Sequence, residues 1–150
     1  YPTDEEVSSK GVKGIFYGHF HKWDAMEHIQ ICKDIGWKPL EEAPKGSWVD
    51  YENCDMKFID LRENIKFLKY GYGRATDQLN IAIRNRRISR EDALAIVRNI
   101  DGNFSTDNRK EFCDYIGITE KYFMRVVDGF VNTDLFKKVD DIWLPKFTRN

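Results

Sequence analysis

The stretch Asn64–Asp77, NIKFLKYGYGRATD, decides how this chain folds, because it holds the end of one helix, a tight turn and the start of another. Leu61, Ile65 and Leu68 recur at i, i+4 and i+7, which is the spacing of one apolar helix face. Gly71 falls where that helix is expected to end, since glycine takes the left-handed position after a helix without a steric penalty. The stretch therefore predicts two consecutive helices joined by a glycine corner.

The start of the second helix is a candidate anion site. We expect this helix to begin behind Gly73 and to be capped by a side-chain oxygen of Thr76 or Asp77. A helix start presents unpaired N–H groups and the positive end of the helix dipole. Lys69 and Arg74 add full positive charges, so the turn could hold a phosphate or a carboxylate. The alternative is a plain helix corner whose basic side chains face water.

Length and composition indicate a globular protein with a real core. The 150 residues are most simply one domain, and the 14% of aromatic residues must help to build its core. The net charge of −1 gives no general attraction to nucleic acid or to an anionic membrane. There is no apolar run near the roughly 18 residues that a membrane-spanning helix needs. No signal peptide or lipidation motif is visible.

The cysteines and the first residue bear on the origin of the chain. Cys32, Cys54 and Cys113 are odd in number and far apart, which suits free thiols in a cytoplasmic protein. Without paired cysteines near the histidines, we expect no zinc site. The first residue is Tyr1 rather than Met, and we expect the chain to be a piece of a longer protein.

A second candidate site lies near the N-terminus. The aromatic run in Gly14–His19 predicts a short strand, and Asp24 is a good N-cap for the helix that follows. His19, His21, Trp23 and Asp24 crowd the turn between them. Ligands of open α/β sheets bind beyond the carboxyl ends of strands, so this turn is a candidate ligand site. The alternative is a capped helix with a packed tryptophan and solvent-exposed histidines.

The rest of the chain predicts a connector followed by helices. Residues 37–57 contain two prolines and are expected to cross the surface as a connector, held by Trp37, Trp48 and Tyr51. Apolar spacing and capping residues predict helices over about Ile59–Tyr70, Ala75–Arg87, Ser89–Ile100 and Asn108–Tyr115, and another helix capped by Thr119. A small hairpin around Asp140-Asp141 is possible within Phe136–Phe147.

The predicted fold is therefore mainly α, with one short strand–helix unit and a possible small C-terminal hairpin. We expect three parts: residues 1–36 as the strand–helix unit, 37–57 as the connector and 58–150 as a helical C-terminal domain.

Common catalytic motifs are absent from the sequence. We find no P-loop, no dinucleotide fingerprint, no H-E-x-x-H and no G-x-S-x-G, and no residue qualifies as catalytic or as a metal ligand. The segment RNRRISREDALAIVRN places basic residues around a helix–turn–helix corner, as in small DNA-binding domains. Glu91, Asp92 and Asp101 interrupt this basic surface, which argues against nucleic-acid binding; a DNA-binding domain is the alternative reading of this segment.

Several segments together resemble a known family. In order they are YPTDEE, GIFYGHFHKWD, FLKYGYGRATD, IRNRRISREDALAIVRNIDG and YFMRVVDGF. Their order and spacing, over about Tyr1–Phe147, are similar to the C-terminal part of the N-acetyl sugar amidotransferases of lipopolysaccharide and surface-glycan biosynthesis. GYGRATD and ISREDALAIVRNIDG are the most specific segments.

The resemblance implies an ATP-dependent ligase of the pyrophosphatase-loop type. Such enzymes are thought to adenylate the N-acetyl carbonyl of a nucleotide sugar, after which ammonia attacks and leaves an acetamidino group. A glutamine amidotransferase pair, similar to the two subunits of imidazole glycerol phosphate synthase, would supply the ammonia. The family's serine-glycine-glycine nucleotide loop is absent from this chain. ATP and Mg would thus belong to a parent enzyme in the bacterial cytoplasm, and we expect no catalysis by these residues alone.

The resemblance also implies a substrate site. The strand would belong to the parent α/β domain, with His19, Trp23 and Asp24 at its carboxyl end facing the nucleotide or sugar. The opposite wall would be formed by six residues of the glycine corner: Lys69, Gly71, Gly73, Arg74, Thr76 and Asp77. Arg74 and the helix start suit a diphosphate, while Asp77 suits a sugar hydroxyl or an ammonium ion.

Two other functions stay open from the sequence. The chain could be a helical docking module for the ammonia-supplying subunits, with residues 37–57 and the aromatic C-terminus as its contact surface. It could also be the small helix–turn–helix DNA-binding domain described above.

Overall fold

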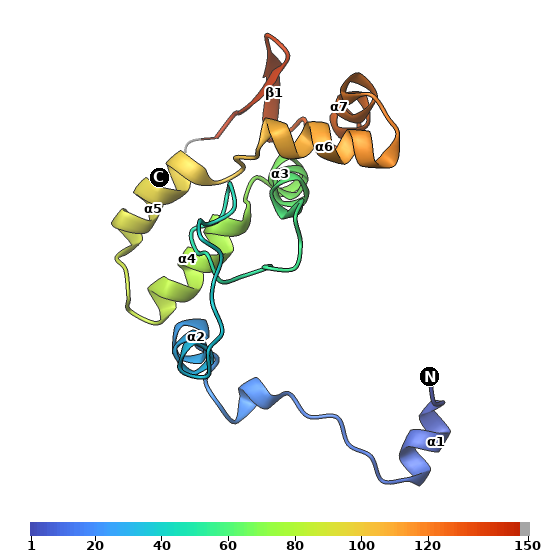
Figure 1. The fold of residues 1–150 in the computed structure, drawn as a ribbon, viewed down its shortest axis with the longest axis vertical. Helices are drawn as coiled ribbons and strands as arrows, with labels where there is room; N and C mark the ends of the chain where they lie inside the picture. The colour runs from blue at the N-terminus through green and yellow to red at the C-terminus, as the bar shows by residue number, and fades with distance from the viewer. Residues whose placement is uncertain (148–150) are drawn as a thin grey trace. The chain divides into compact units, whose positions relative to one another are not determined.

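The computed structural model of the protein describes residues 1–147 and is mainly helical, as predicted (Figure 1). The chain divides into two compact units, Tyr1–Gly36 and Trp37–Asn150. Each unit is described by itself below.

The first unit contains two short helices and one helical turn. Helix α1 spans Asp4–Ser9, the 3₁₀ turn η1 spans Tyr17–His19 and α2 spans Ala25–Asp34. Helix α1 starts with a complete capping box, in which the Thr3 hydroxyl accepts the Glu6 N–H and the Glu6 carboxylate accepts the Thr3 N–H. Asp24 caps α2 as predicted, and its Oδ1 accepts the N–H of the second helical residue at 3.1 Å.

The strand predicted over Gly14–His19 is wrong. Its second half forms η1, in which the His19 N–H donates to the Phe16 carbonyl at 2.9 Å and the Phe20 N–H donates to the Tyr17 carbonyl at 3.0 Å. A strand needs a neighbour for its backbone groups, and within residues 1–147 the C-terminal hairpin is the one sheet. The aromatic run therefore satisfies its backbone groups locally.

The second unit carries five helices and a hairpin within the described residues. The helices are α3 (Ile59–Tyr70), α4 (Arg74–Arg84), α5 (Arg90–Ile100), α6 (Thr106–Ile116) and α7 (Glu120–Asp128), and the strands are β1 (Phe136–Val139) and β2 (Ile142–Pro145). The bounds of α3 and the end of α5 are as predicted. Helix α4 ends three residues before the predicted Arg87, and α6 starts two residues before the predicted Asn108, because Ser105 caps it.

Local capping chemistry defines most of these ends. Ser89 and Thr119 each accept the N–H three residues further on, at 3.0 and 3.1 Å, and so start α5 and α7 as predicted. Gly71 and Gly117 end α3 and α6 in the left-handed conformation, with φ of 81° and 73°.

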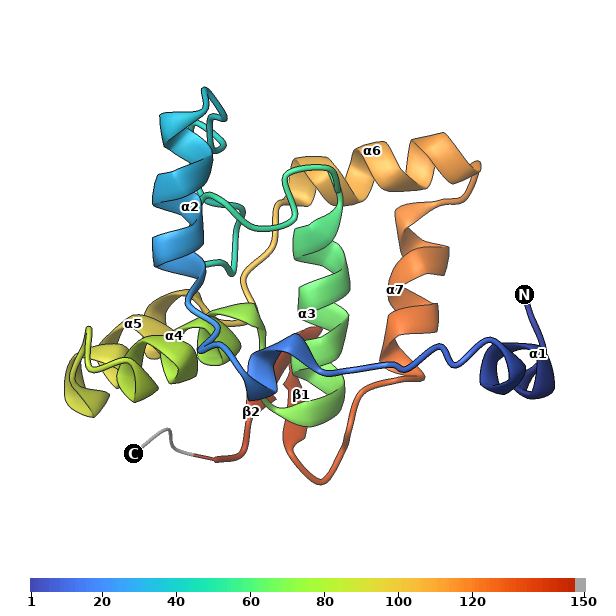
Figure 2. The same cartoon turned by 90° about the horizontal axis from the view of Figure 1, so that it is seen from below.

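Two apolar clusters form the core of this unit. The first joins α3, α7 and β1 through the buried residues Phe67, Leu68, Val127, Val131 and Phe136. The second joins α4 and α5, which lie side by side in Figures 1 and 2, through Ala75, Leu79, Ala93 and Val97. Full burial of a side chain such as Phe136 or Leu79, each 1% exposed, stabilises a fold by about 1.5–3 kcal/mol.

The C-terminal hairpin is present and turns where the sequence predicts. Strands β1 and β2 pair antiparallel, with Phe136 opposite Pro145 and Val139 opposite Ile142. Asp140 and Asp141 both have positive φ, 47° and 63°, as the two central residues of a type I′ turn require. Short polar side chains tolerate this conformation better than most, which explains why two aspartates hold the turn.

The connector at residues 37–57 forms neither helix nor strand, but it is tied to α4. The Trp48 N–H donates to Gln78 Oε1 at 2.7 Å, and Gln78 Nε2 donates back to Ser47 Oγ at 2.9 Å. The Ala75 N–H donates to the Gly46 carbonyl at 3.1 Å. Since Trp48 also packs against the second cluster, this connector is part of the folded unit.

Candidate functional site

The predicted anion site at the start of α4 already holds a carboxylate of the chain itself. Gly73 is the N-cap residue and α4 begins at Arg74, so the prediction that Thr76 or Asp77 caps this helix is wrong. Asp101 takes that role: its Oδ2 accepts the Gly73 N–H at 2.8 Å, and its Oδ1 accepts the Thr76 N–H at 3.4 Å. The Thr76 hydroxyl also donates to Asp101 Oδ2 at 2.8 Å.

This cap places a negative charge at the positive end of α4, where a substrate anion was predicted. Asp101 is only 6% exposed. Gly73 permits the close approach, because a Cβ at this position would lie 2.6 Å from Asp101 Oδ1. Sequence reasoning missed the cap because the carboxylate comes from 28 residues further along the chain.

The charged residues beside this helix start also have partners within the chain. Arg74 forms an ion pair with Glu52 of the connector. Asp77 forms an ion pair with Lys66 of α3. The charges that were expected to hold a diphosphate and a sugar hydroxyl are thus neutralised internally in this structure.

A very small cavity lies behind the Arg74–Glu52 pair. Its volume is about 10 Å³, and Asp60, Glu63 and Arg74 are among the residues that line it. Glu63 Oε2 and Arg74 Nε are buried there without a hydrogen-bond partner. A space of this size accommodates about one water molecule and leaves no room for a sugar.

The other residues of the glycine corner serve packing. The Lys69 amine lies 5.2 Å from the centre of the Tyr70 ring and 5.9 Å from that of Phe130, within the range of cation–π contacts. Gly71 ends α3, and a Cβ there would lie 3.2 Å from Leu135. The structure thus brings the six corner residues together in one turn, and their binding of substrate stays a prediction.

His19, Trp23 and Asp24 belong to the first unit, whereas the corner residues belong to the second. His19 lies in η1, and the Trp23 ring packs edge-on against His28, with 4.6 Å between centroids. These residues do not follow a strand, so the reason given for placing a ligand beside them no longer applies. Substrate binding by them also stays a prediction.

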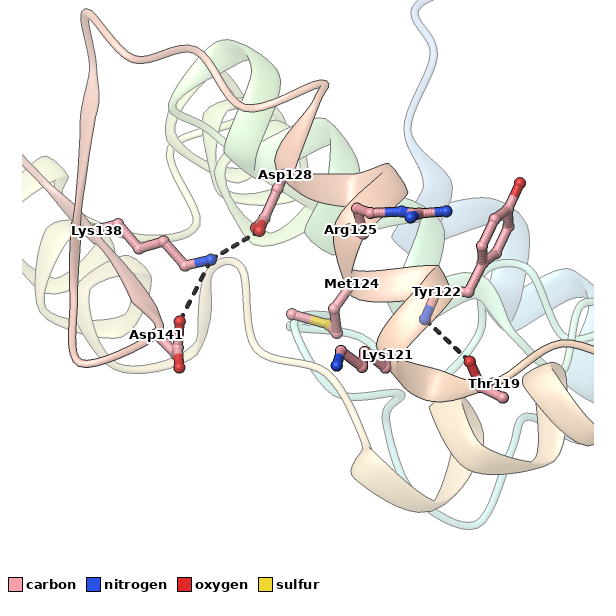
Figure 3. A pocket seen from close by; sticks show the side chains of 8 residues that line it. All are labelled: Thr119, Lys121, Tyr122, Met124, Arg125, Asp128, Lys138 and Asp141. Atoms are coloured by element: carbon pink, nitrogen blue, oxygen red, sulfur yellow. Dashed lines mark hydrogen bonds and ion pairs between the residues drawn. The ribbon is translucent and has the colours of Figure 1, made fainter.

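A larger pocket lies between α7 and the hairpin (Figure 3). Its volume is about 680 Å³, within the range of roughly 300–1,000 Å³ typical of small-molecule sites. Its charged lining residues are the cations Lys121, Arg125 and Lys138 and the carboxylates Asp128 and Asp141. The sequence signal that could have revealed it is the pair of basic residues four apart in KYFMR, residues 121–125, which lie on one face of a helix.

One wall of the pocket is an ion-pair network. Figure 3 shows the Lys138 amine between two carboxylates, 2.7 Å from Asp128 and 3.5 Å from Asp141. Trp143 Nε1–H donates to the other oxygen of Asp128 at 2.8 Å. The hydrogen bonds from Lys138 and Trp143 hold the pKa of Asp128 below its usual value. The hydrogen bond to Asp128 raises the pKa of Lys138.

The other wall carries cations without such partners. Within residues 1–147, no ion pair joins Lys121 or Arg125 to a carboxylate. The Arg125 guanidinium lies 5.0 Å from the centre of the Tyr122 ring, beside which Figure 3 shows it. This arrangement can attract an anion. The described residues contain no group of three or more histidine, cysteine or acidic side chains that could hold a metal ion.

The second unit is thus a small helical domain closed by a β-hairpin, with a ligand-sized, partly basic pocket. None of the described helices is long and apolar enough to span a membrane.

A family model described as "LPS biosynthesis protein WbpG-like, C-terminal domain" matches residues 45–148, from the connector to just beyond the hairpin. The chain belongs to this family, so its role is in lipopolysaccharide biosynthesis, and the resemblance predicted from the sequence is confirmed over residues 45–148. The search of curated proteins found no match.

Proposed function

We propose that this chain is the C-terminal substrate-recognition part of an ATP-dependent amidotransferase that acts on a nucleotide-linked N-acetyl sugar. The observation that carries the proposal is the family match over residues 45–148, which covers most of the second unit. The pocket beside α7 supports it, because its volume suits a substantial part of such a substrate.

In the proposed reaction, the parent enzyme would transfer the AMP group of ATP to the N-acetyl carbonyl oxygen, and pyrophosphate, neutralised by Mg, would leave. Ammonia from a glutamine amidotransferase then attacks the activated carbon. The oxygen leaves as part of AMP, and the product carries an acetamidino group on a sugar destined for surface polysaccharide. The second unit would hold the substrate during both steps in the bacterial cytoplasm, while the nucleotide loop would belong to another part of the enzyme.

Titration of the ¹⁵N-labelled chain with UDP-N-acetylglucosamine tests substrate recognition. We expect backbone amide shifts confined to one region of the second unit, and no ATP hydrolysis by the chain alone. UDP-glucose serves as the matched control ligand, because it keeps the uridine diphosphate and the hexose but lacks the N-acetyl group. Equal shifts with both ligands, or none with either, would contradict recognition of a nucleotide-linked N-acetyl sugar.

A second candidate function is docking to the ammonia-supplying subunits. It is favoured by exposed rings at the C-terminal ends of α3 and α7: Tyr70 is 56% exposed and Phe130 is 57% exposed. Aromatic side chains are enriched at protein interfaces. Trp48, by contrast, packs against the second cluster, so it is a poor probe of the predicted connector surface.

The docking function can be tested by pull-down of the glutaminase partner. Tyr70→Ala with Phe130→Ala should abolish capture if these rings form the contact. Tyr115→Ala is a matched control, since this ring is 81% exposed at the end of α6. Unchanged capture by the double variant would exclude this surface.

A further inference from the structure

The basic residues of the second unit differ in whether the chain neutralises them. Two of the cations at the predicted site, Lys66 and Arg74, have carboxylate partners, and Lys69 faces the Tyr70 and Phe130 rings. Elsewhere in the unit Lys57 and Arg109 are paired in the same way. The start of α4 is likewise satisfied by Asp101. An anionic ligand at any of the paired cations or at this helix start would have to displace a partner of the same charge.

Lys121 and Arg125 are different. Both line the pocket beside α7, and neither forms an ion pair within the described residues. They are four residues apart on one helix, so their Cβ atoms are about 5–6 Å apart. Long side chains at that separation can both reach one phosphate or two linked phosphates. Arginine in particular binds phosphate oxygens with two N–H groups.

The opposite wall of the pocket is held in place. Lys138 is fixed by Asp128 and Asp141, and Trp143 donates to Asp128 from the hairpin. This network joins β1 and β2 to α7, so the hairpin maintains the shape of the pocket. The Asp141 carboxylate is 98% exposed and can accept hydrogen bonds from a ligand hydroxyl.

The pocket also offers surface for the uncharged parts of a ligand. Tyr122 is 47% exposed and presents its ring beside Arg125, while Met124 lies on the side of the hairpin (Figure 3). A ring and a guanidinium together suit a nucleobase or a sugar face next to a phosphate.

We propose that Lys121 and Arg125 bind the diphosphate of the nucleotide sugar in the pocket between α7 and the hairpin. The identity of this ligand rests on the proposed function. The location of the site does not rest on the proposed function. It follows from the two cations of this pocket that lack carboxylate partners within the described residues, and from the volume of the pocket.

The test compares three forms of the full chain by titration with UDP-N-acetylglucosamine, UDP and inorganic phosphate. They are the parent, the pocket variant Lys121→Ala/Arg125→Ala and the control variant Arg84→Ala/Lys110→Ala. The control removes the same charge from exposed positions of α4 and α6, away from the pocket. Far-ultraviolet circular dichroism and melting curves check that all three forms are folded.

We expect the pocket variant to bind UDP and UDP-N-acetylglucosamine about ten-fold more weakly or worse, because two charge-assisted contacts are lost. The control should bind like the parent, and amide shifts should centre on residues 121–125 and 138. Inorganic phosphate should bind far more weakly than UDP, since it lacks the second phosphate and the uridine. Phosphate binding as tight as that of UDP would overturn the nucleotide as the ligand.

Two other outcomes separate this inference from the proposed function. If the folded pocket variant binds as tightly as the parent, the pocket is overturned while recognition of the nucleotide sugar stands. Shifts at Gly73 and Thr76 would then move the site to the start of α4. If the parent binds none of the three ligands, both the ligand class of this pocket and the proposed substrate recognition fail.

Discussion

Asp101 has the clearest role of any single side chain, since it caps a helix from 28 residues away. Asp101→Ala would leave the buried N–H of Gly73 and the partly buried N–H of Thr76 without this acceptor. Losing a helix cap costs about 0.5–2 kcal/mol, and a buried unsatisfied donor adds to that. We expect the free energy of unfolding to fall by about 2 kcal/mol, measured by urea denaturation.

The matched controls for Asp101 separate the cap from the charge. Asp101→Asn keeps one acceptor oxygen and should destabilise less than alanine. Asp114→Ala removes an exposed carboxylate from α6 and should change stability by no more than about 0.5 kcal/mol. Equal effects of Asp101→Ala and Asp114→Ala would show that the cap contributes nothing.

Gly102, the residue after Asp101, lies close to the Phe67 ring. It has a φ of +85°, and a Cβ there would lie 2.4 Å from Phe67 Cδ1. Gly117 has a similar φ of +73° but nothing within 4 Å of such a Cβ. Left-handed backbone costs a non-glycine residue about 1–2 kcal/mol, and core overpacking adds about 1–3 kcal/mol.

We therefore expect Gly102→Ala to lower the free energy of unfolding by about 3 kcal/mol and Gly117→Ala by about 1 kcal/mol. Thermal melts of the two variants side by side measure the difference. Similar melting temperatures would mean that Phe67 moves aside freely.

At the scale of elements, the sequence predicts those helix ends and turns that depend on residues next to them in the chain. The ends of α3, α5 and α6 depend on Gly71, Ser89 and Gly117, each of which acts within a few residues of itself. The turn at Asp140-Asp141 is equally local.

The larger errors occur where a distant partner decides, whereas the start of α6 was misplaced by only two residues although its cap, Ser105, is local. The strand at Gly14–His19 would have needed a neighbouring strand, and the cap of α4 comes from Asp101. The pocket beside α7 combines a helix with a hairpin that follows it, so helical spacing alone showed only its basic residues. Sequence patterns therefore located the elements better than the contacts between them.

The attachment of the hairpin to α7 should depend on pH. Asp128 has a lowered pKa in the folded state, so its contribution to stability is present above the unfolded pKa of about 3.9 and is lost as pH falls through the folded pKa. Lys138 has a raised pKa, so its contribution is present below about 10.4 and is lost as pH rises through the folded pKa. The pair is fully effective between these limits.

We expect Asp128→Asn to lower the urea midpoint at neutral pH, since it removes the ion pair but keeps an acceptor for Trp143. The difference from the parent should shrink as pH falls below about 4, where the unfolded parent takes up a proton at Asp128, and should vanish once the pH passes the lowered pKa that Asp128 has in the folded state. Urea titrations of both forms at several pH values, followed by circular dichroism, measure this. A difference that is independent of pH down to acid denaturation would argue against the ion pair.

At the scale of the molecule, the two sequence segments that we expected to be the most specific to the family are in contact. GYGRATD contributes Gly73 and Thr76, and the end of ISREDALAIVRNIDG contributes Asp101, which binds both. The following Gly102 carbonyl accepts a hydrogen bond from Asn64 of α3 at 2.7 Å. These segments therefore join α3, α4 and α5. Their residues have this structural role whether or not they also bind substrate.

The two units differ in whether they contain a hydrophobic core. The two apolar clusters lie entirely within Trp37–Asn150, whereas none of the helices in Tyr1–Gly36 buries an apolar residue. Isolated helices shorter than about 12–15 residues are marginal in water, and α2 has 10 residues.

We expect residues 37–150 to fold alone with a cooperative melt, and residues 1–36 alone to be largely unfolded. Circular dichroism of both fragments measures this, with the intact chain as control. A non-cooperative melt of residues 37–150 would mean that the helical domain needs Tyr1–Gly36 to fold.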